Sequence, residues 1–127
     1  GTGHSVSFVG NVHEGPHALN GRNTTLMRPG MIVTDEPGVY ETDLVGIRIE
    51  NELVCVHKAD NQYGTFLGFE PIMFVPIATS PIVPGVLTKD ELDWLNNYHR
   101  QVFEKLAPRL NDEEREWLAK KCAAIGC

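Results

Sequence analysis

The sequence lacks several features that would assign a protein to a class at once. No apolar run in its 127 residues approaches the roughly 18–20 residues that a membrane-spanning helix needs, so we expect no membrane segment. The three cysteines, Cys55, Cys122 and Cys127, form no CxxC pair, which is typical of proteins in the reducing cytoplasm. No methionine or leader opens the sequence, so we expect a part of a longer, cytoplasmic protein.

Basic residues are also few. Eleven lysines and arginines against seventeen acidic residues give a formal net charge of −6, and no basic cluster offsets that balance. Such a charge repels phosphate backbones, so we expect no nucleic-acid partner. With 42% hydrophobic residues, the chain is long enough to bury one core without disulfide bonds.

The pattern of hydrophobic and turn-forming residues changes along the chain. The first 78 residues are rich in glycine, proline and β-branched residues, arranged as short apolar runs between turn signals. These runs predict strands at 5–12, 31–34, 46–58 and 72–77, with a surface loop at 16–29. In the third run, alternation places Arg48, Glu50 and Glu52 on one strand face.

Residues 86–127 have a helical period instead. Thr88 and Glu91 form a capping box ahead of an apolar stripe that Pro108 terminates. A second helix start follows at residues 111–114, with Trp117 and Leu118 on its apolar side. The sequence therefore predicts an α+β chain in which strands come first and two helices follow.

Three short motifs carry side chains that can bind a metal ion. They contain His4 with His13 nine residues later, Glu36 ahead of a Pro-Gly turn, and Glu50 within a strand pattern. Imidazole and carboxylate ligands in combination suit Mn²⁺ or Zn²⁺. Each motif also has an ordinary explanation: a hydrogen-bonded histidine, a glutamate that opens a turn, and an exposed strand face.

The order and surroundings of these motifs resemble a known family. Residues 11–16 (Asn-Val-His-Glu-Gly-Pro), 30–38 (Gly-Met-Ile-Val-Thr-Asp-Glu-Pro-Gly) and 46–51 (Gly-Ile-Arg-Ile-Glu-Asn) resemble the pita-bread metallopeptidases, and among them the long cytosolic aminopeptidase P group. Residues 69–71, 75–77 and 93–99 resemble the C-terminal extension of that group.

The resemblance implies a fold, an activity and partners. Residues 1–64 would be the second half of a pita-bread domain with a curved antiparallel sheet, and residues 65–127 an extension with a strand and two helices. The implied activity is hydrolysis of the N-terminal Xaa-Pro peptide bond by a hydroxide that two divalent ions hold. The ions would be Mn²⁺, with Zn²⁺ or Co²⁺ as alternatives, and the implied assembly is a homodimer through the C-terminal part.

The resemblance also implies residue roles. His4, Glu36 and Glu50 would be metal ligands, Glu36 would also carry a proton, and His13 would stabilise the tetrahedral intermediate. The family's two aspartate ligands have no counterpart here, so we expect the chain alone to be inactive. Arg48 would either orient the carboxylates or form an ordinary cross-strand ion pair. The remaining histidines are predicted to lie at the surface or in packing positions: His17, His57 and His99.

Two alternatives to a peptidase stay open at this point. The chain could belong to a pita-bread homologue that has lost catalysis and serves as a binding module. It could also be a dimerisation unit that acts through its apolar helices. The two aspartates in a longer sequence would test the first alternative, and a measurement of oligomeric state would test the second.

Overall fold

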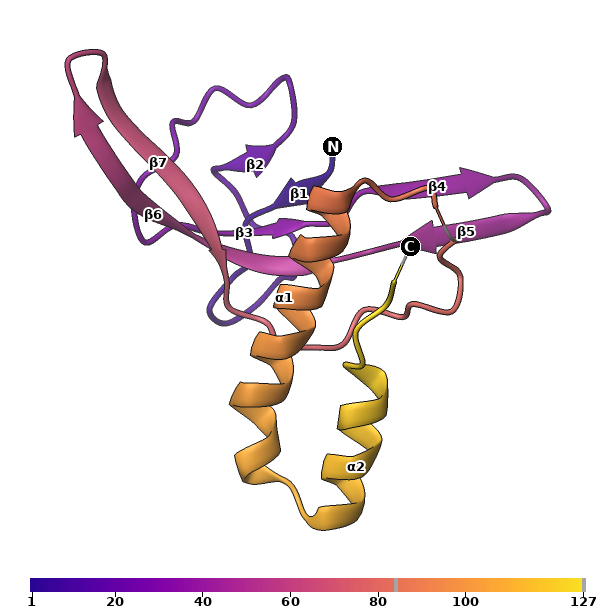
Figure 1. Ribbon diagram of the computed structural model, residues 1–127. Helices are drawn as coiled ribbons and strands as arrows, with labels where there is room; N and C mark the ends of the chain where they lie inside the picture. The colour runs from indigo at the N-terminus through magenta and orange to yellow at the C-terminus, as the bar shows by residue number, and fades with distance from the viewer. Residues whose placement is uncertain (84, 127) are drawn as a thin grey trace. The chain divides into compact units, whose positions relative to one another are not determined.

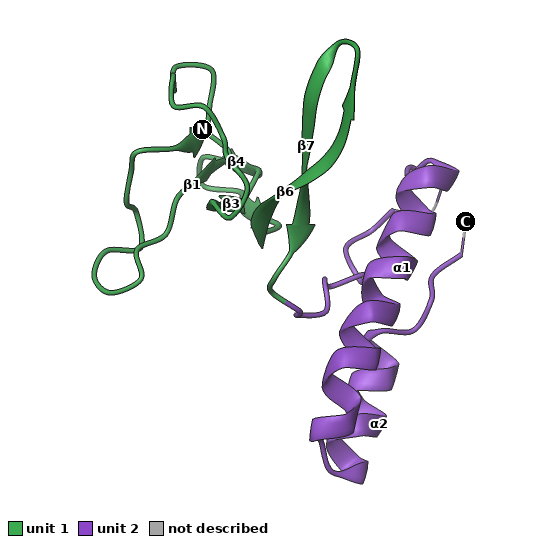
Figure 2. Ribbon diagram, turned by 90° about the vertical axis from the view of Figure 1, so that its left-hand side faces the viewer, with its two compact units in different colours: residues 1–73 green, residues 74–127 purple. Residues whose placement is uncertain are grey.

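The computed structural model describes residues 1–83 and 85–126, so Pro84 and Cys127 lie outside the described residues. The chain divides into two compact units, residues 1–73 and residues 74–127 (Figure 2). The first unit contains all the described strands and the second contains the helices (Figure 1). No described helix is both long enough and apolar enough to cross a bilayer.

The first unit is built from antiparallel strand pairs. Its main sheet has the order β3-β6-β7, formed by β3 (Ile32–Asp35), β6 (Asn51–Asn61) and β7 (Gly64–Pro71). There are two smaller pairs. β1 (Gly3–His4) pairs with β2 (Ala18–Leu19) ahead of β3, and β4 (Gly38–Glu41) pairs with β5 (Val45–Arg48) between β3 and β6. The core of this unit is small and centres on Val33 and Cys55, from the adjacent strands β3 and β6.

The second unit is held together by two capped helices. Helix α1 (Lys89–Leu106) begins after Thr88, and α2 (Asp112–Lys121) begins after Asn111, each with a complete capping box. Between them a short 3₁₀ turn, η1 (Ala107–Arg109), contains Pro108, which ends α1 as expected. Three side chains form the centre of the core: Tyr98, Val102 and Leu118.

Two neighbouring side chains of α1 hold the extended segment 74–77. The Tyr98 hydroxyl donates to the Val75 carbonyl at 2.9 Å and accepts from the Val75 N–H at 3.2 Å. The Ile77 N–H donates to Nε2 of His99 at 3.1 Å, and His99 is fully buried. Helix side chains therefore satisfy backbone groups that a neighbouring strand would satisfy in a sheet.

The buried His99 predicts a loss of stability in mild acid. Burial lowers the pKa of His99, and its Nε2 can accept from the Ile77 N–H only while the ring is neutral. Because the unfolded ring takes up a proton near pH 6.5 and the folded ring resists it, stability present above pH 6.5 is lost as the pH falls below that value. Urea unfolding followed by tryptophan fluorescence at pH 7.5 and 5.5 measures this loss.

The control for this prediction is His99→Gln, which should be less stable at pH 7.5 but should show a flatter dependence on pH. Glu91 does not contribute to the change in stability between pH 7.5 and 5.5, because the hydrogen bond from the Thr88 N–H holds the pKa of Glu91 below its usual 4.5. Equal pH dependence in the variant and the parent chain would contradict the assignment to His99.

Three of the predicted strands differ from the structure. Residues 5–12 form an irregular loop because Ser5 bonds to residues 14 and 17 rather than to a neighbouring strand. The run 46–58 is divided between β5 and β6, which a break at residues 49–50 separates. Residues 72–77 belong to no strand: the Ile72 N–H donates to the Glu52 carbonyl, and the backbone groups of Val75 and Ile77 bond to Tyr98 and His99 of α1.

Candidate metal centre

The candidate centre begins where β1 lies against the end of β3. The His4 N–H donates to Oγ1 of Thr34 at 3.1 Å, and the Glu36 N–H donates to the Thr2 carbonyl at 2.6 Å. Gly3 makes this approach possible, since a Cβ at that position would overlap the backbone carbonyl of Thr34. The contact brings His4 and Glu36 together although 32 residues of sequence separate them.

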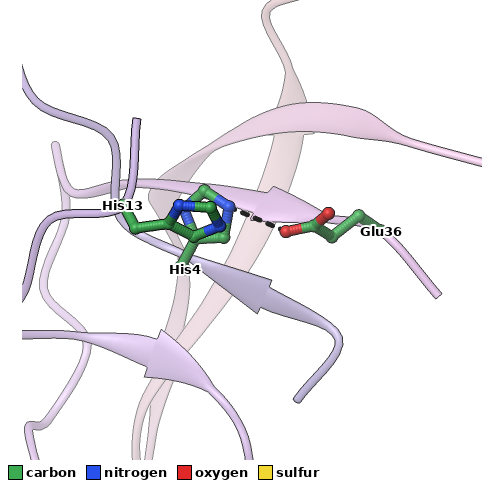
Figure 3. Close-up of side chains that lie close together, drawn as sticks. All are labelled: His4, His13 and Glu36. Atoms are coloured by element: carbon green, nitrogen blue, oxygen red, sulfur yellow. Dashed lines mark ion pairs between the residues drawn. The ribbon is translucent and has the colours of Figure 1, made fainter. Parts of the chain in front are cut away.

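A folded-back loop adds the second histidine. The Glu14 N–H donates to the Ser5 carbonyl at 3.1 Å, and the Ser5 N–H donates to the His17 carbonyl at 3.2 Å. The Ser5 hydroxyl also contacts the Glu14 carbonyl. These bonds place His13 beside His4, with ring centroids 4.2 Å apart and the ring planes inclined by 45° (Figure 3).

Together these elements gather three potential ligands. His4, His13 and Glu36 each offer a ligand atom, and these atoms all lie within 4.8 Å of one another. Nε2 of His4 is 2.7 Å from Oε1 of Glu36 (Figure 3). The His4 and Glu36 side chains are 16% and 14% exposed, whereas His13 is exposed, so the group is open on one side.

Glu36 is held by two further residues. Thr34 donates its hydroxyl to Oε1 of Glu36 at 3.2 Å, so one threonine links the His4 backbone to the Glu36 carboxylate. Arg48 reaches Oε2 of Glu36 at 3.4 Å, and its guanidinium lies over the ring of Tyr40. Of the two interpretations of Arg48, its contact with the candidate ligand favours an orienting role.

Sequence reasoning did not identify Thr34 as part of this arrangement. The signal that could have found it is its position two residues before Glu36, because side chains two apart in an extended strand share one face. Glu50, in contrast, was expected to be a metal ligand, but it lies exposed between β5 and β6. Within the described part of the chain, the cluster of potential ligands does not include Glu50.

The three ligands border an open cavity of about 470 Å³. The sides of this cavity include Gly38, Tyr40 and Arg48 as well as the N-terminal residues 1–3. A carboxylate, two imidazoles and a guanidinium around one space can hold a divalent cation and a polar ligand beside it. Such an arrangement suits metal-assisted chemistry better than a purely structural metal site, which would be closed.

Comparison with known proteins places this chain in a family. A model of metallopeptidase family M24 matches residues 1–57, and a model of the C-terminal region of peptidase M24 matches residues 65–125. Aminopeptidase P2 of Arabidopsis thaliana is 46% identical over 125 residues, which cover 93% of this chain and 18% of that protein. A probable Xaa-Pro aminopeptidase P of Coprinopsis cinerea is 41% identical, with 98% and 21% of the two chains covered.

A solved structure is similar over nearly the whole chain. X-prolyl aminopeptidase from Caenorhabditis elegans, described as a cytosolic enzyme with a di-nuclear active site, is 39% identical, with a TM-score of 0.84. The match covers 98% of this chain and 21% of that one, so the chain spans about a fifth of the length of these relatives. It confirms the α+β fold, with antiparallel sheets from part of a pita-bread domain followed by two helices. On the matches to both family models, which together reach from residue 1 to residue 125, the chain belongs to metallopeptidase family M24.

Proposed function

We propose that this chain contributes the C-terminal part of a cytoplasmic Xaa-Pro aminopeptidase, which removes the first residue from peptides with proline at the second position. The observation that carries the proposal is the pair of His4 and Glu36, brought together by the β1–β3 contact inside the region that the metallopeptidase model matches. The similarity to Xaa-Pro aminopeptidases over more than nine-tenths of the chain supports the choice of substrate.

The proposed enzyme uses two divalent ions, Mn²⁺ in the first instance, with Zn²⁺ or Co²⁺ as alternatives. When bound, such ions supply an activated water molecule and polarise the carbonyl group of the scissile bond. His4 and Glu36 fit this use, because they place a nitrogen and a carboxylate oxygen side by side at a cavity. In the proposal Glu50 would be a further ligand, and two aspartates from polypeptide outside these 127 residues would complete the set.

The proposed roles of the chain's own residues follow from their contacts. Glu36 accepts a proton from the attacking water on a carboxylate oxygen and passes it to the proline nitrogen as the peptide bond breaks. Arg48 and Thr34 fix the Glu36 carboxylate through one oxygen each. His13 donates a ring N–H toward the oxygen on which negative charge develops.

The test compares this chain with the complete enzyme on two peptides, one with proline and one with alanine at the second position. We expect the complete, Mn²⁺-loaded enzyme to release the first residue only from the proline peptide. We expect the 127-residue chain alone to release none, because the proposed aspartate ligands are not in it. An inactive complete protein would favour the alternative of a binding module, and activity of the short chain would contradict the proposed ligand set.

We also propose that residues 65–127 form an extension that mediates a homodimer. Both tryptophans of the second unit are exposed, Trp94 by 59% and Trp117 by 57%, and Trp94 stacks on Tyr98 with centroids 5.7 Å apart. Exposed aromatic side chains are frequent anchors of interfaces. Light scattering should therefore find a dimer, and a monomer of 14.1 kDa at about 100 µM, well above ordinary dissociation constants, would contradict the proposal.

A further inference from the structure

We infer that Asn20 is a site of spontaneous modification, at which the folded chain converts this asparagine to aspartate and isoaspartate. Asn20 is exposed and follows β2 directly, at the start of a turn over residues 20–23 that the bond from the Asn23 N–H to the Asn20 carbonyl closes at 3.4 Å. Of the asparagines in the sequence, Asn20 alone is followed by a glycine. The inference concerns the covalent structure of the chain and does not rest on the proposed peptidase activity.

The reaction uses an atom of the next residue as its nucleophile. The Gly21 backbone nitrogen attacks Cγ of Asn20, its proton passes to a base in the solvent, and Nδ2 takes up a proton and leaves as ammonia. The product is a cyclic imide. Water then adds to either carbonyl carbon of the imide and breaks the bond from that carbon to the nitrogen, which yields aspartate or isoaspartate. Water is the only co-reactant.

Two backbone N–H groups activate the Asn20 carboxamide. Those of Arg22 and Asn23 each donate to Oδ1 of Asn20 at 2.9 Å. Negative charge gathers on Oδ1 when the Gly21 nitrogen attacks, and donors that are already in place stabilise this charge, as they do in the oxyanion holes of enzymes. The same two bonds fold the side chain back along the turn, toward the peptide group that attacks it.

The attacking nitrogen and the leaving nitrogen have no competing bonds. Within residues 1–83 and 85–126, no hydrogen bond engages the Gly21 N–H or Nδ2 of Asn20. Gly21 is exposed and has no Cβ to obstruct the approach of its nitrogen to Cγ. The attack therefore does not first have to break a hydrogen bond of the fold.

Asn23 provides a comparison within the same loop. Its Oδ1 also accepts from the backbone N–H two residues later, that of Thr25, at 2.8 Å. Its Nδ2, however, donates to the Pro16 carbonyl at 2.9 Å, which holds the leaving group in place. The residue that follows it is Thr24, whose branched Cβ crowds the attacking nitrogen. We therefore expect Asn23 to remain an asparagine.

The product changes both the charge and the backbone beside β2. Each conversion adds one negative charge to the formal net charge of −6, and isoaspartate also lengthens the backbone by one carbon. The change lies next to Leu19, whose carbonyl accepts from the Thr2 N–H at 3.0 Å and which pairs with Gly3 of β1. The modification therefore acts at the end of the strand pair β1–β2.

The experiment incubates the 127-residue chain in mildly alkaline buffer and follows it by isoelectric focusing and by peptide mapping with mass spectrometry. An endoprotease that cleaves before aspartate but not before isoaspartate distinguishes the two products. We expect a species with one additional negative charge and a change of mass confined to the peptide that contains Asn20. Persistence of Asn20, or conversion of Asn23 at the same rate, would overturn the inference.

Gly21→Ala is the matched variant. A Cβ at this position meets no atom within 4 Å, and the backbone of Gly21 lies outside the left-handed region, so the fold should not be strained. The variant should convert Asn20 several times more slowly, because the added Cβ crowds the attacking nitrogen. Equal rates in the variant and the parent chain would contradict the proposed attack by the Gly21 nitrogen.

A further measurement on the unmutated chain separates the folded turn from the unfolded chain. Urea below the concentration that unfolds the chain raises the small unfolded fraction but leaves the turn intact in most molecules. The rate of conversion should stay unchanged over this range, because the folded turn itself supports the attack. A rate that rises in proportion to the unfolded fraction would overturn the inference.

Discussion

Replacing Glu36 by Gln is expected to remove Zn²⁺ binding by this chain almost entirely, with a loss of affinity of roughly 100-fold or more. Glu36 is the only carboxylate in the cluster of His4, His13 and Glu36, and it is one of the proposed metal ligands. The substitution keeps the size of the side chain and an oxygen that can accept from Thr34. It removes the negative charge that faces Nε2 of His4. Calorimetric titration with Zn²⁺ measures the effect.

The folded state should survive this change, which makes the result interpretable. The ion pair between Glu36 and Arg48 involves an arginine side chain that is 52% exposed, and such pairs contribute about 0–1 kcal/mol. Glu41→Gln, at the exposed end of β4, is the control and should bind Zn²⁺ as the parent chain does. Unchanged binding in Glu36→Gln would show that the ion lies elsewhere.

The helices were predictable because their signals are local. Thr88 and Asn111 each have a glutamate three residues later, and the hydrogen bonds that this spacing favours are all formed. The prediction of a strand at residues 72–77 was wrong because residues distant in the sequence determine the hydrogen bonds there. The apolar pattern of this segment suits an extended backbone, but Tyr98 and His99, more than twenty residues away, bond to the backbone groups of Val75 and Ile77 that a sheet would pair.

The site was predictable in part. His4 and Glu36 could be identified because their motifs resemble a family, but no pattern in the sequence shows that β1 lies on β3 or that His13 folds back beside His4. Both arrangements depend on backbone hydrogen bonds between distant residues. Glu50 shows most directly where the sequence pattern fails to predict the position of a side chain. Alternation extends through residues 47–52, yet the backbone leaves the strand at 49–50, and no local signal in the sequence marks that break.

The contact between β1 and β3 leads to the second large expected effect. Gly3→Ala should destabilise the first unit by about 3 kcal/mol or more, because the added Cβ would overlap the Thr34 carbonyl, which belongs to the backbone and cannot rotate away. Relief of the overlap requires β1 to move off β3. That movement would break the His4 N–H bond to Thr34 and separate His4 from Glu36, so Zn²⁺ binding should weaken together with stability.

Urea unfolding followed by far-ultraviolet circular dichroism measures the stability lost in Gly3→Ala, with Gly21→Ala as the matched control. A Cβ at Gly21 would meet no atom within 4 Å, so that variant should unfold with the parent chain. Tryptophan fluorescence offers a second comparison, because Trp94 and Trp117 both belong to the helical unit. If Gly3→Ala unfolded at the same urea concentration as Gly21→Ala and still bound Zn²⁺, then the close approach of β1 to Thr34 could not be what positions His4.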